Sequence, residues 1–298
     1  MPDRVHRHTR ERSRQVLDKV RHSQIVDEVR KRVRGKILRV IDEAVRPYHR
    51  EQAERIAKLQ HEVEELRRQA DRAVDATVQY EIRARRDLVF AGEQEAAKES
   101  ARFVRRHLPT APHFGHPHAT LEHALGLVST EGMALEFGVY TGSTLKLIAT
   151  AYEGRDVYGF DSFEGLPEDW RNGFPAGLFG MDGLPDVDGA ELVVGWFDDT
   201  LPGFLDEHPG PVSFLHVDCD LYSSTKTVLE LVGPRLVPGT VIVFDEYFNY
   251  PGWQDHEHKA WSEYVDLTGI EFDYCGYTYD HEQVIMKVTG VPEASQQG

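Results

Sequence analysis

Two short apolar runs in the second half of the chain each end in acidic residues. Asp218 and Asp220 follow the first run, and Asp245 and Glu246 end the second. The carboxyl ends of parallel strands open onto one crevice, so we expect these carboxylates to converge. Burying several carboxylates together is unfavourable, because their negative charges repel one another. A hard divalent cation such as Mg²⁺, with Mn²⁺ or Ca²⁺ as alternatives, would offset this repulsion. Asp220 could instead cap the helix expected at 223–233.

A glycine-containing turn after an earlier apolar run is the second candidate site. Residues 136–143 are EFGVYTGS, and Asp161 ends the next apolar run. The glycines let the backbone pass close to a ligand, Glu136 can accept a hydrogen bond from an ammonium group, and Asp161 suits two ribose hydroxyls. A nicotinamide dinucleotide requires a G-x-G-x-x-G turn around its pyrophosphate, whereas this turn is G-x-x-x-G. The turn therefore favours a ligand with a cationic amino acid end, with an ordinary tight turn as the alternative.

Apolar runs alternate with helical patterns from about residue 118 onward. We expect helices at 119–130, 143–152, 223–233 and 254–268. We expect strands at 133–140, 156–161, 190–197, 211–218, 239–246, 270–277 and 283–288. This alternation predicts an α/β fold with a doubly wound, mostly parallel sheet of seven strands. The last two runs are close enough for a hairpin, which makes one edge strand antiparallel.

A long stretch without clear periodicity, residues 164–189, is rich in Gly and Pro. Loops of this length inside a domain are usually functional lids or disordered segments. Its apolar side chains favour a lid over a ligand rather than a plain surface loop: Trp170, Phe174, Phe179 and Met181.

The first 106 residues differ from the rest in charge and composition. They hold 27 Lys and Arg against 19 Asp and Glu, whereas residues 107–298 hold 7 against 31. Such asymmetry predicts two modules with a boundary after residue 106. The first is rich in helix-favouring residues, and we expect a helical hairpin or short coiled coil that forms a homo-oligomer. Its heptad positions are Ile56, Leu59, Val63, Leu66, Ala70, Ala73, Thr77 and Tyr80.

The basic stretch 4–39 has two interpretations. It could bind nucleic acid, membrane or another polyanion, or it could be a solvated helical face, which is the commoner role of a charge run. The acidic half repels phosphate backbones, so nucleic acid is not expected as its substrate.

The composition also indicates the cellular compartment in which the protein is expected. No run reaches the roughly 18 to 20 apolar residues of a membrane span, and no apolar stretch follows the basic N-terminus as in a secretory signal. Two cysteines, Cys219 and Cys275, are too few for a disulfide framework. We therefore expect a cytoplasmic protein.

Several segments resemble the macrocin O-methyltransferase family: LEFGVYTGSTL, VYGFDSFEGLP, GWFDDTLPGFL and the run from VDCDLYSST to VIVFDEY. The resemblance spans roughly residues 133–290, and its DSFEGLP and DxDLYxST elements are specific. It implies the class I methyltransferase fold and methyl transfer from S-adenosylmethionine to a hydroxyl of a sugar or small molecule, assisted by a divalent metal.

The resemblance also implies roles for individual residues. Asp218, Asp245 and Glu246 match the metal triad, although the family usually has Asp-Asp at the last two positions. Asp220 matches the proposed general base, with Asp218 beside it as the second catalytic residue. The expected cofactor contacts are Glu136, Gly138, Tyr140, Thr141, Gly142, Ser143, Asp161, Ser162, Phe163, Trp196, Phe197 and Asp198.

Other interpretations stay open at this point. His256 and His258 could be a second base, substrate contacts or ordinary polar helix residues. The domain could be a non-catalytic scaffold, although a scaffold has no need of converging carboxylates. A nicotinamide-dependent oxidoreductase is disfavoured by the turn sequence.

Overall fold

A computed structural model describes the backbone of residues 3–292 and the side chains of residues 26–292. The basic stretch 4–39 is therefore described in full only from residue 26 onward. The chain forms two compact units, residues 1–85 and 86–298. This boundary lies before the expected one because helix α2 (Leu88–His107) packs onto the second unit, where Ala96 and Ser100 are buried and Phe103 contacts the aromatic core.

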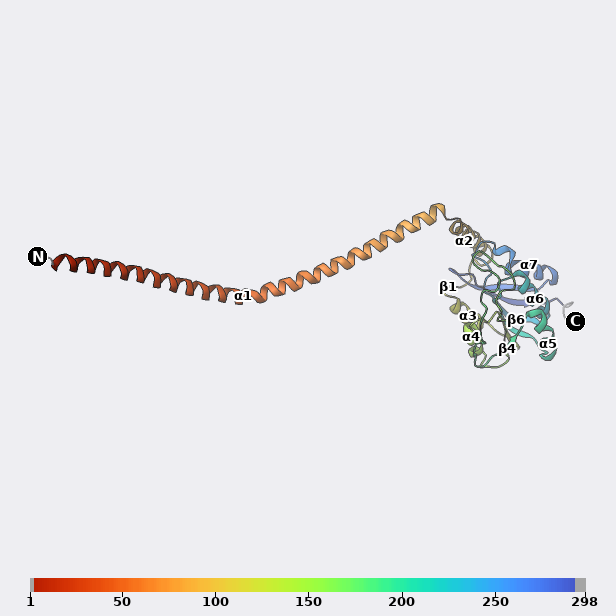
Figure 1. Ribbon diagram of the computed structural model, residues 1–298. Coiled ribbons are helices and arrows are strands. Elements are labelled where there is room, and N and C mark those ends of the chain that lie inside the picture. The colour runs from red at the N-terminus through yellow and green to blue at the C-terminus, as the bar shows by residue number, and fades with distance from the viewer. Residues whose placement is uncertain (1–2, 293–298) are drawn as a thin grey trace. The chain divides into compact units, whose positions relative to one another are not determined.

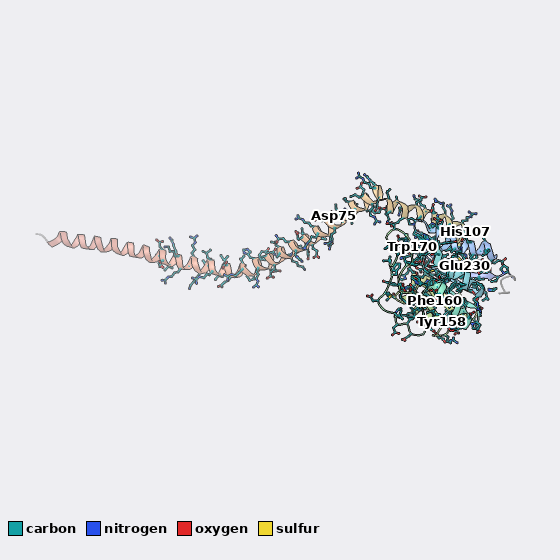
Figure 2. All side chains as sticks on the ribbon, turned by 45° about the vertical axis from the view of Figure 1, so that its right-hand side comes forward. Asp75, His107, Tyr158, Phe160, Trp170 and Glu230 are labelled. Atoms are coloured by element: carbon teal, nitrogen blue, oxygen red, sulfur yellow. The ribbon has the colours of Figure 1, made fainter. Side chains whose placement is uncertain are left out.

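The first unit is a single long helix, α1 (Asp3–Arg86), which replaces the expected hairpin (Figure 1). From residue 26 onward its residues are exposed, except that Gly35 and Gln52 are partly covered (Figure 2). Ion pairs one turn apart, such as Arg50 with Glu54 at 3.1 Å, support the exposed helix. Among the described helices, none has the length and apolarity needed to cross a membrane.

The second unit contains one sheet in the order β1-β7-β8-β6-β5-β2-β3-β4. Its strands are β1 (His113–Phe114), β2 (Met133–Phe137), β3 (Val157–Asp161), β4 (Glu191–Val194), β5 (Val212–Val217), β6 (Leu236–Phe244), β7 (Glu271–Thr278) and β8 (Val284–Gly290). Only β8 runs antiparallel to its neighbours among the described strands, which confirms the mostly parallel sheet and its hairpin. The expectation that the antiparallel strand lies at an edge is wrong, because β8 is inserted between β7 and β6. The expected count of seven strands is wrong, because the two-residue β1 pairs with the edge of β7 and is too short to show a pattern.

Helices cover both faces of this sheet through two apolar clusters. One cluster joins the strands to α3 (Pro117–Leu125) and α4 (Ser143–Ala151). The other joins them to α2, α5 (Phe197–Glu207), α6 (Tyr222–Val232) and α7 (Glu257–Thr268). Two short 3-10 turns complete the unit, at Gly233–Arg235 and Trp253–Asp255.

Helix α5 was not among the expected helices, and the strand expected at 190–197 is shorter than predicted. The strand ends at Val194, and Trp196 becomes the N-cap of α5. Asp198 and Asp199 occupy the first turn, where acidic side chains favour a helix N-terminus.

The turn after β2 depends on a close approach between β2 and the end of β5. Gly138 has φ +91°, and a Cβ atom there would lie 1.7 Å from the Asp218 carbonyl oxygen. Only glycine fits this position, because any side chain would push the two strand ends apart. The acids after β5 thus lie directly beside the glycine turn.

Two truncations test the unit boundary. We expect a chain that starts at residue 86 to unfold cooperatively near the melting temperature of the full protein. A chain that starts at residue 107 loses Phe103 and the bond from the Asn249 amide to Ser100 Oγ (2.8 Å). Losing such core contacts costs about 2–4 kcal/mol, so its Tm should fall by roughly 5 °C or more in thermal unfolding. Equal Tm values for both chains would contradict the new boundary.

Candidate active site

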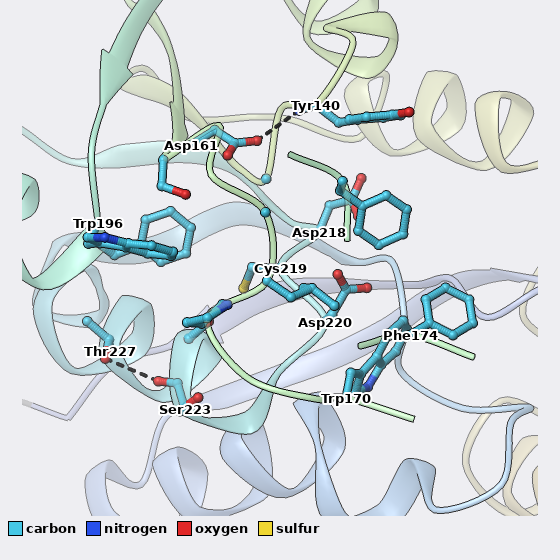
Figure 3. Close-up of a pocket in the computed structure, with 18 of the residues that line it drawn as sticks. Tyr140, Asp161, Trp170, Phe174, Trp196, Asp218, Cys219, Asp220, Ser223 and Thr227 are labelled. Atoms are coloured by element: carbon cyan, nitrogen blue, oxygen red, sulfur yellow. Dashed lines mark hydrogen bonds between the residues drawn. The ribbon is translucent and has the colours of Figure 1, made fainter. Parts of the chain in front are cut away.

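A cavity of about 640 Å³ lies at the carboxyl ends of β2, β3, β5 and β6. It is lined by the following expected site residues: Gly138, Tyr140, Asp161, Ser162, Trp196, Phe197, Asp198, Asp218, Asp220 and Glu246. In Figure 3, Asp161 and Trp196 lie on one side of Asp218 and Asp220, and Trp170 lies on the other. Expected site residues outside the lining are Glu136, Thr141, Gly142, Ser143, Phe163 and Asp245.

Asp161 fixes the glycine turn. Its Oδ2 accepts hydrogen bonds from the backbone amides of Val139 and Tyr140, both at 2.9 Å, and its Oδ1 accepts one from Phe163 at 2.7 Å. These bonds stabilise the left-handed backbone of Tyr140, whose φ is 46°. A carboxylate offers about four acceptor positions and three are taken, so Asp161 can still accept about one hydrogen bond from a ligand in the cavity.

Glu136 lies behind the turn and is fully buried, which differs from the expected contact with a ligand. A buried carboxylate needs a partner, and His216 Nδ1 donates to Glu136 Oε1 at 2.8 Å. On its other side, His216 Nε2 lies 3.5 Å from Asp245 Oδ1. Burial alone would lower the pKa of His216, but its bonds to Asp245 and Glu136 raise it well above the usual value. Burial also raises the pKa of Glu136, and the two bonds favour the charged form of His216, which links Glu136 to Asp245.

The expected acidic residues do converge, and Glu257 joins them. Burial raises the pKa of Asp218 and of Glu246 well above the usual range, and neighbouring carboxylates raise both further. Burial also raises the pKa of Asp220 to about 7, although the nearby Arg171 charge opposes the change. Glu257 accepts a bond from the Glu246 amide at 3.0 Å, and burial raises its pKa as well.

These carboxylates fit a hard divalent cation. One Oε atom each of Glu246 and Glu257 is buried without a hydrogen-bond partner in the described part of the chain. Ligand atoms of His216, Asp218 and Asp245 lie within 4.8 Å of one another. A protonated imidazole has no free lone pair, so the carboxylates are the better ligands. Asp245 is further oriented by Gln283, whose Nε2 donates to its Oδ2 at 2.9 Å.

The long loop between β3 and β4 forms one wall of the cavity. It is closed on itself by backbone bonds from Leu166 to Leu178 (2.9 Å) and from Gly177 to Leu166 (2.8 Å). Its aromatic side chains Trp170, Phe174 and Phe179 line the cavity. The fourth expected lid residue, Met181, packs instead against the apolar cluster beside α4.

Arg171 is a site residue that the sequence did not reveal. Its guanidinium lies 3.9 Å from the Trp170 ring centre and 4.4 Å from that of Tyr250, and it pairs with Glu282 at 3.0 Å. Among the described residues that line the cavity, Arg171 is the one Lys or Arg. The stack holds a positive charge at a fixed place beside the carboxylates.

Neither histidine proposed as a second base lines the cavity. His258 packs against the rings of Phe103, Tyr247 and Trp253, and burial lowers its pKa to about 4. His256 lies against Trp170, and burial lowers its pKa too. His258 is thus an uncharged core residue.

The buried carboxylates predict an inverted pH dependence of stability without a divalent cation. A folded state that raises a carboxyl pKa binds more protons than the unfolded state, so stability falls as pH rises between the two values. For Asp220 this window runs from about 4 to about 7. The lowered pKa of Asp245 acts only below its usual value, whereas the lowered pKa of His258 adds stability up to about pH 6.5. The fall is therefore expected above that pH, and in chelator Tm should drop by roughly 5 °C or more between pH 6.5 and 8.

Adding Mg²⁺ at pH 8 should restore the lost Tm, because the cation binds the ionised carboxylates of the folded state. Asp218→Asn should abolish the Mg²⁺ effect, and NaCl of equal ionic strength should not reproduce it. A Tm in chelator that rises with pH across this range would contradict the ionisation scheme.

Comparison with known proteins points to one class of domain. Residues 135–247 match a family model described as a methyltransferase domain. A relative from Streptomyces olivaceus, named 8-demethyl-8-(2,3-dimethoxy-alpha-L-rhamnosyl)-tetracenomycin-C 4'-O-methyltransferase, is 33% identical over 39% of this chain and 53% of its own. Mycinamicin III 3''-O-methyltransferase from Micromonospora griseorubida is 30% identical over 47% of this chain and 62% of its own.

The chain thus spans less than two thirds of each of these relatives. The crystal structure of a calicheamicin methyltransferase is 24% identical, with a TM-score of 0.44 over 60% of this chain and 87% of that chain. The segment that carries Asp161, Asp218 and Asp245 therefore matches a methyltransferase domain.

Proposed function

We propose that the protein transfers a methyl group from S-adenosylmethionine to a hydroxyl of a sugar or small molecule, with help from a divalent cation such as Mg²⁺. The observation that carries this is the cavity in which Asp218 and Asp220 lie beside Asp161 and Trp196. It lies within a segment similar to methyltransferase domains, and the relatives named above are O-methyltransferases. The macrocin-type resemblance favours a glycoside acceptor, with a phenol second.

The cofactor would occupy the side of the cavity formed by the glycine turn and the start of α5. Asp161 would accept from one ribose hydroxyl, and Trp196, Phe197 and Asp198 would surround the adenine. Gly138 leaves the backbone open to the amino acid end. Because His216 already engages Glu136, that end would contact the backbone of the turn rather than the Glu136 side chain.

Asp218, Asp245 and Glu246 would hold the cation, whose presence lowers the pKa of a hydroxyl and fixes its position. Asp220 lines the same cavity, and its pKa of about 7 suits a group that accepts a proton at neutral pH. The hydroxyl oxygen then forms a bond to the methyl carbon while the carbon–sulfur bond of the sulfonium breaks. The proton goes to Asp220, and the sulfur leaves as a neutral thioether.

The loop between β3 and β4 would form the side of the cavity that binds the methyl acceptor. Trp170 and Phe174 offer apolar faces on which a sugar ring can pack, and they exclude water from the reacting groups. Arg171, held by three rings and Glu282, would orient the acceptor rather than react. Alignment of oxygen, methyl and sulfur by such contacts contributes much of the expected rate.

Calorimetric titration tests the cofactor site. Wild type should bind S-adenosylmethionine saturably, and Asp161→Asn should weaken binding about tenfold or more, since it loses charge-assisted hydrogen bonds. Asp206→Asn, an exposed position on α5, should bind as wild type does. Circular dichroism should confirm that Asp161→Asn is folded. A folded wild type that fails to bind would favour the non-catalytic scaffold.

Methyl transfer to a panel of deoxysugar glycosides and phenols tests the catalytic assignment. Asp220→Asn should lower kcat by about 10²–10⁴-fold, as expected for loss of a general base, while cofactor affinity stays unchanged. Asp218→Asn should instead remove the dependence of the rate on Mg²⁺. An Asp220→Asn enzyme with wild-type kcat would exclude Asp220 as the base.

A further inference from the structure

Helix α1 exposes an apolar stripe. Ile56, Leu59, Val63 and Leu66 are 54%, 51%, 48% and 62% exposed, although each is a large hydrophobic side chain. Their spacing of three and four residues places them on one face of the helix. Scattered surface hydrophobics are ordinary, but a continuous apolar stripe marks an interaction surface.

The stripe continues toward the N-terminus with a different period. Val26, Ile37 and Tyr48 are exposed and recur every eleven residues, and so do Val29 and Val40. An eleven-residue repeat corresponds to 3.67 residues per turn, so it drifts around the helix in the opposite sense to heptads. Its segment also contains Pro47, which removes a helix hydrogen bond. We therefore call only the heptad stripe of Ile56, Leu59, Val63 and Leu66 the seam.

We propose that a second copy of this chain covers the seam, in a parallel, in-register, two-stranded coiled coil. The core positions select this arrangement. Ile56 and Val63 are β-branched and occupy position a, whereas Leu59 and Leu66 occupy position d. In parallel coiled coils, β-branched residues at a with leucine at d favour two strands over three or four.

The charges beside the heptads agree with the parallel arrangement. Glu62 occupies position g and Arg67 occupies position e of the next heptad. In a parallel, in-register dimer these positions face each other across the interface, so Glu62 meets Arg67 of the second copy twice by symmetry. Within its own helix Glu62 has a weak competitor, the exposed Lys58 at 3.9 Å. An antiparallel dimer would pair g with g, so Glu62 would no longer face Arg67.

The mass of the full-length protein tests the number of strands. Light scattering after size exclusion should give twice the 34.0 kDa of one chain at micromolar concentration. Cysteines at the seam test direction and register. Leu59→Cys and Leu66→Cys, made separately, should both form disulfide-linked dimers on mild oxidation, because equivalent d positions face each other in a parallel dimer. Arg68→Cys, on the outer face, and wild type should not.

Charge reversal tests the Glu62 contact. Arg67→Glu should weaken dimerisation about tenfold by sedimentation, because two attractive pairs become repulsive. Adding Glu62→Arg should restore the affinity, and Arg68→Glu should leave it unchanged. A monomer, a trimer or larger assembly, or cross-linking of only one seam cysteine would overturn the proposal.

Discussion

Burial of negative charge at the ends of β5 and β6 is the constraint on which the rest of the site depends. Asp218 and Glu246 are half-buried at the cavity wall and Glu257 is buried, and burial and mutual repulsion raise the pKa of all three. His216, whose pKa is raised by its partners, lies between Glu136 and Asp245. The remaining negative charge favours the binding of a cation or a proton at this site. A hydroxyl must lose a proton to become a nucleophile, so such a site suits that step.

The sheet must bring its strand ends together closely for this arrangement to exist. The Asp218 carbonyl occupies the space that any side chain at position 138 would need. Asp161 then closes the neighbouring turn by accepting bonds from three backbone amides. The glycine turn, the acid after β3 and the acids after β5 therefore form one rigid unit, in which a shift of any strand would disturb every ligand-facing group.

The convergence of residues at strand ends could be predicted from the sequence. In a parallel sheet the carboxyl ends of neighbouring strands lie at the same edge, however the side chains pack. Asp161, Asp218 and Asp220 reached the cavity for that reason. Residues that act through contacts distant in sequence could not be predicted. His216 looks like one polar position inside an apolar run, and Arg171 becomes informative only when the rings around it are placed. The domain boundary was misplaced because α2 shares the composition of α1 and differs only in what it packs against.

The loop between β3 and β4 carries the aromatic wall of the cavity, whereas the acids of the cavity lie at the ends of the strands. The loop's backbone bonds close it on itself, and its side chains also contact the rest of the unit. Leu166 and Trp170 belong to the main apolar cluster, and Arg171 pairs with Glu282 at 3.0 Å. Phe179 is 37% exposed, so a change at this residue alters the cavity wall without disturbing that cluster. In evolutionary terms, changes at the exposed part of one loop can reshape the cavity while the sheet and its acids stay the same.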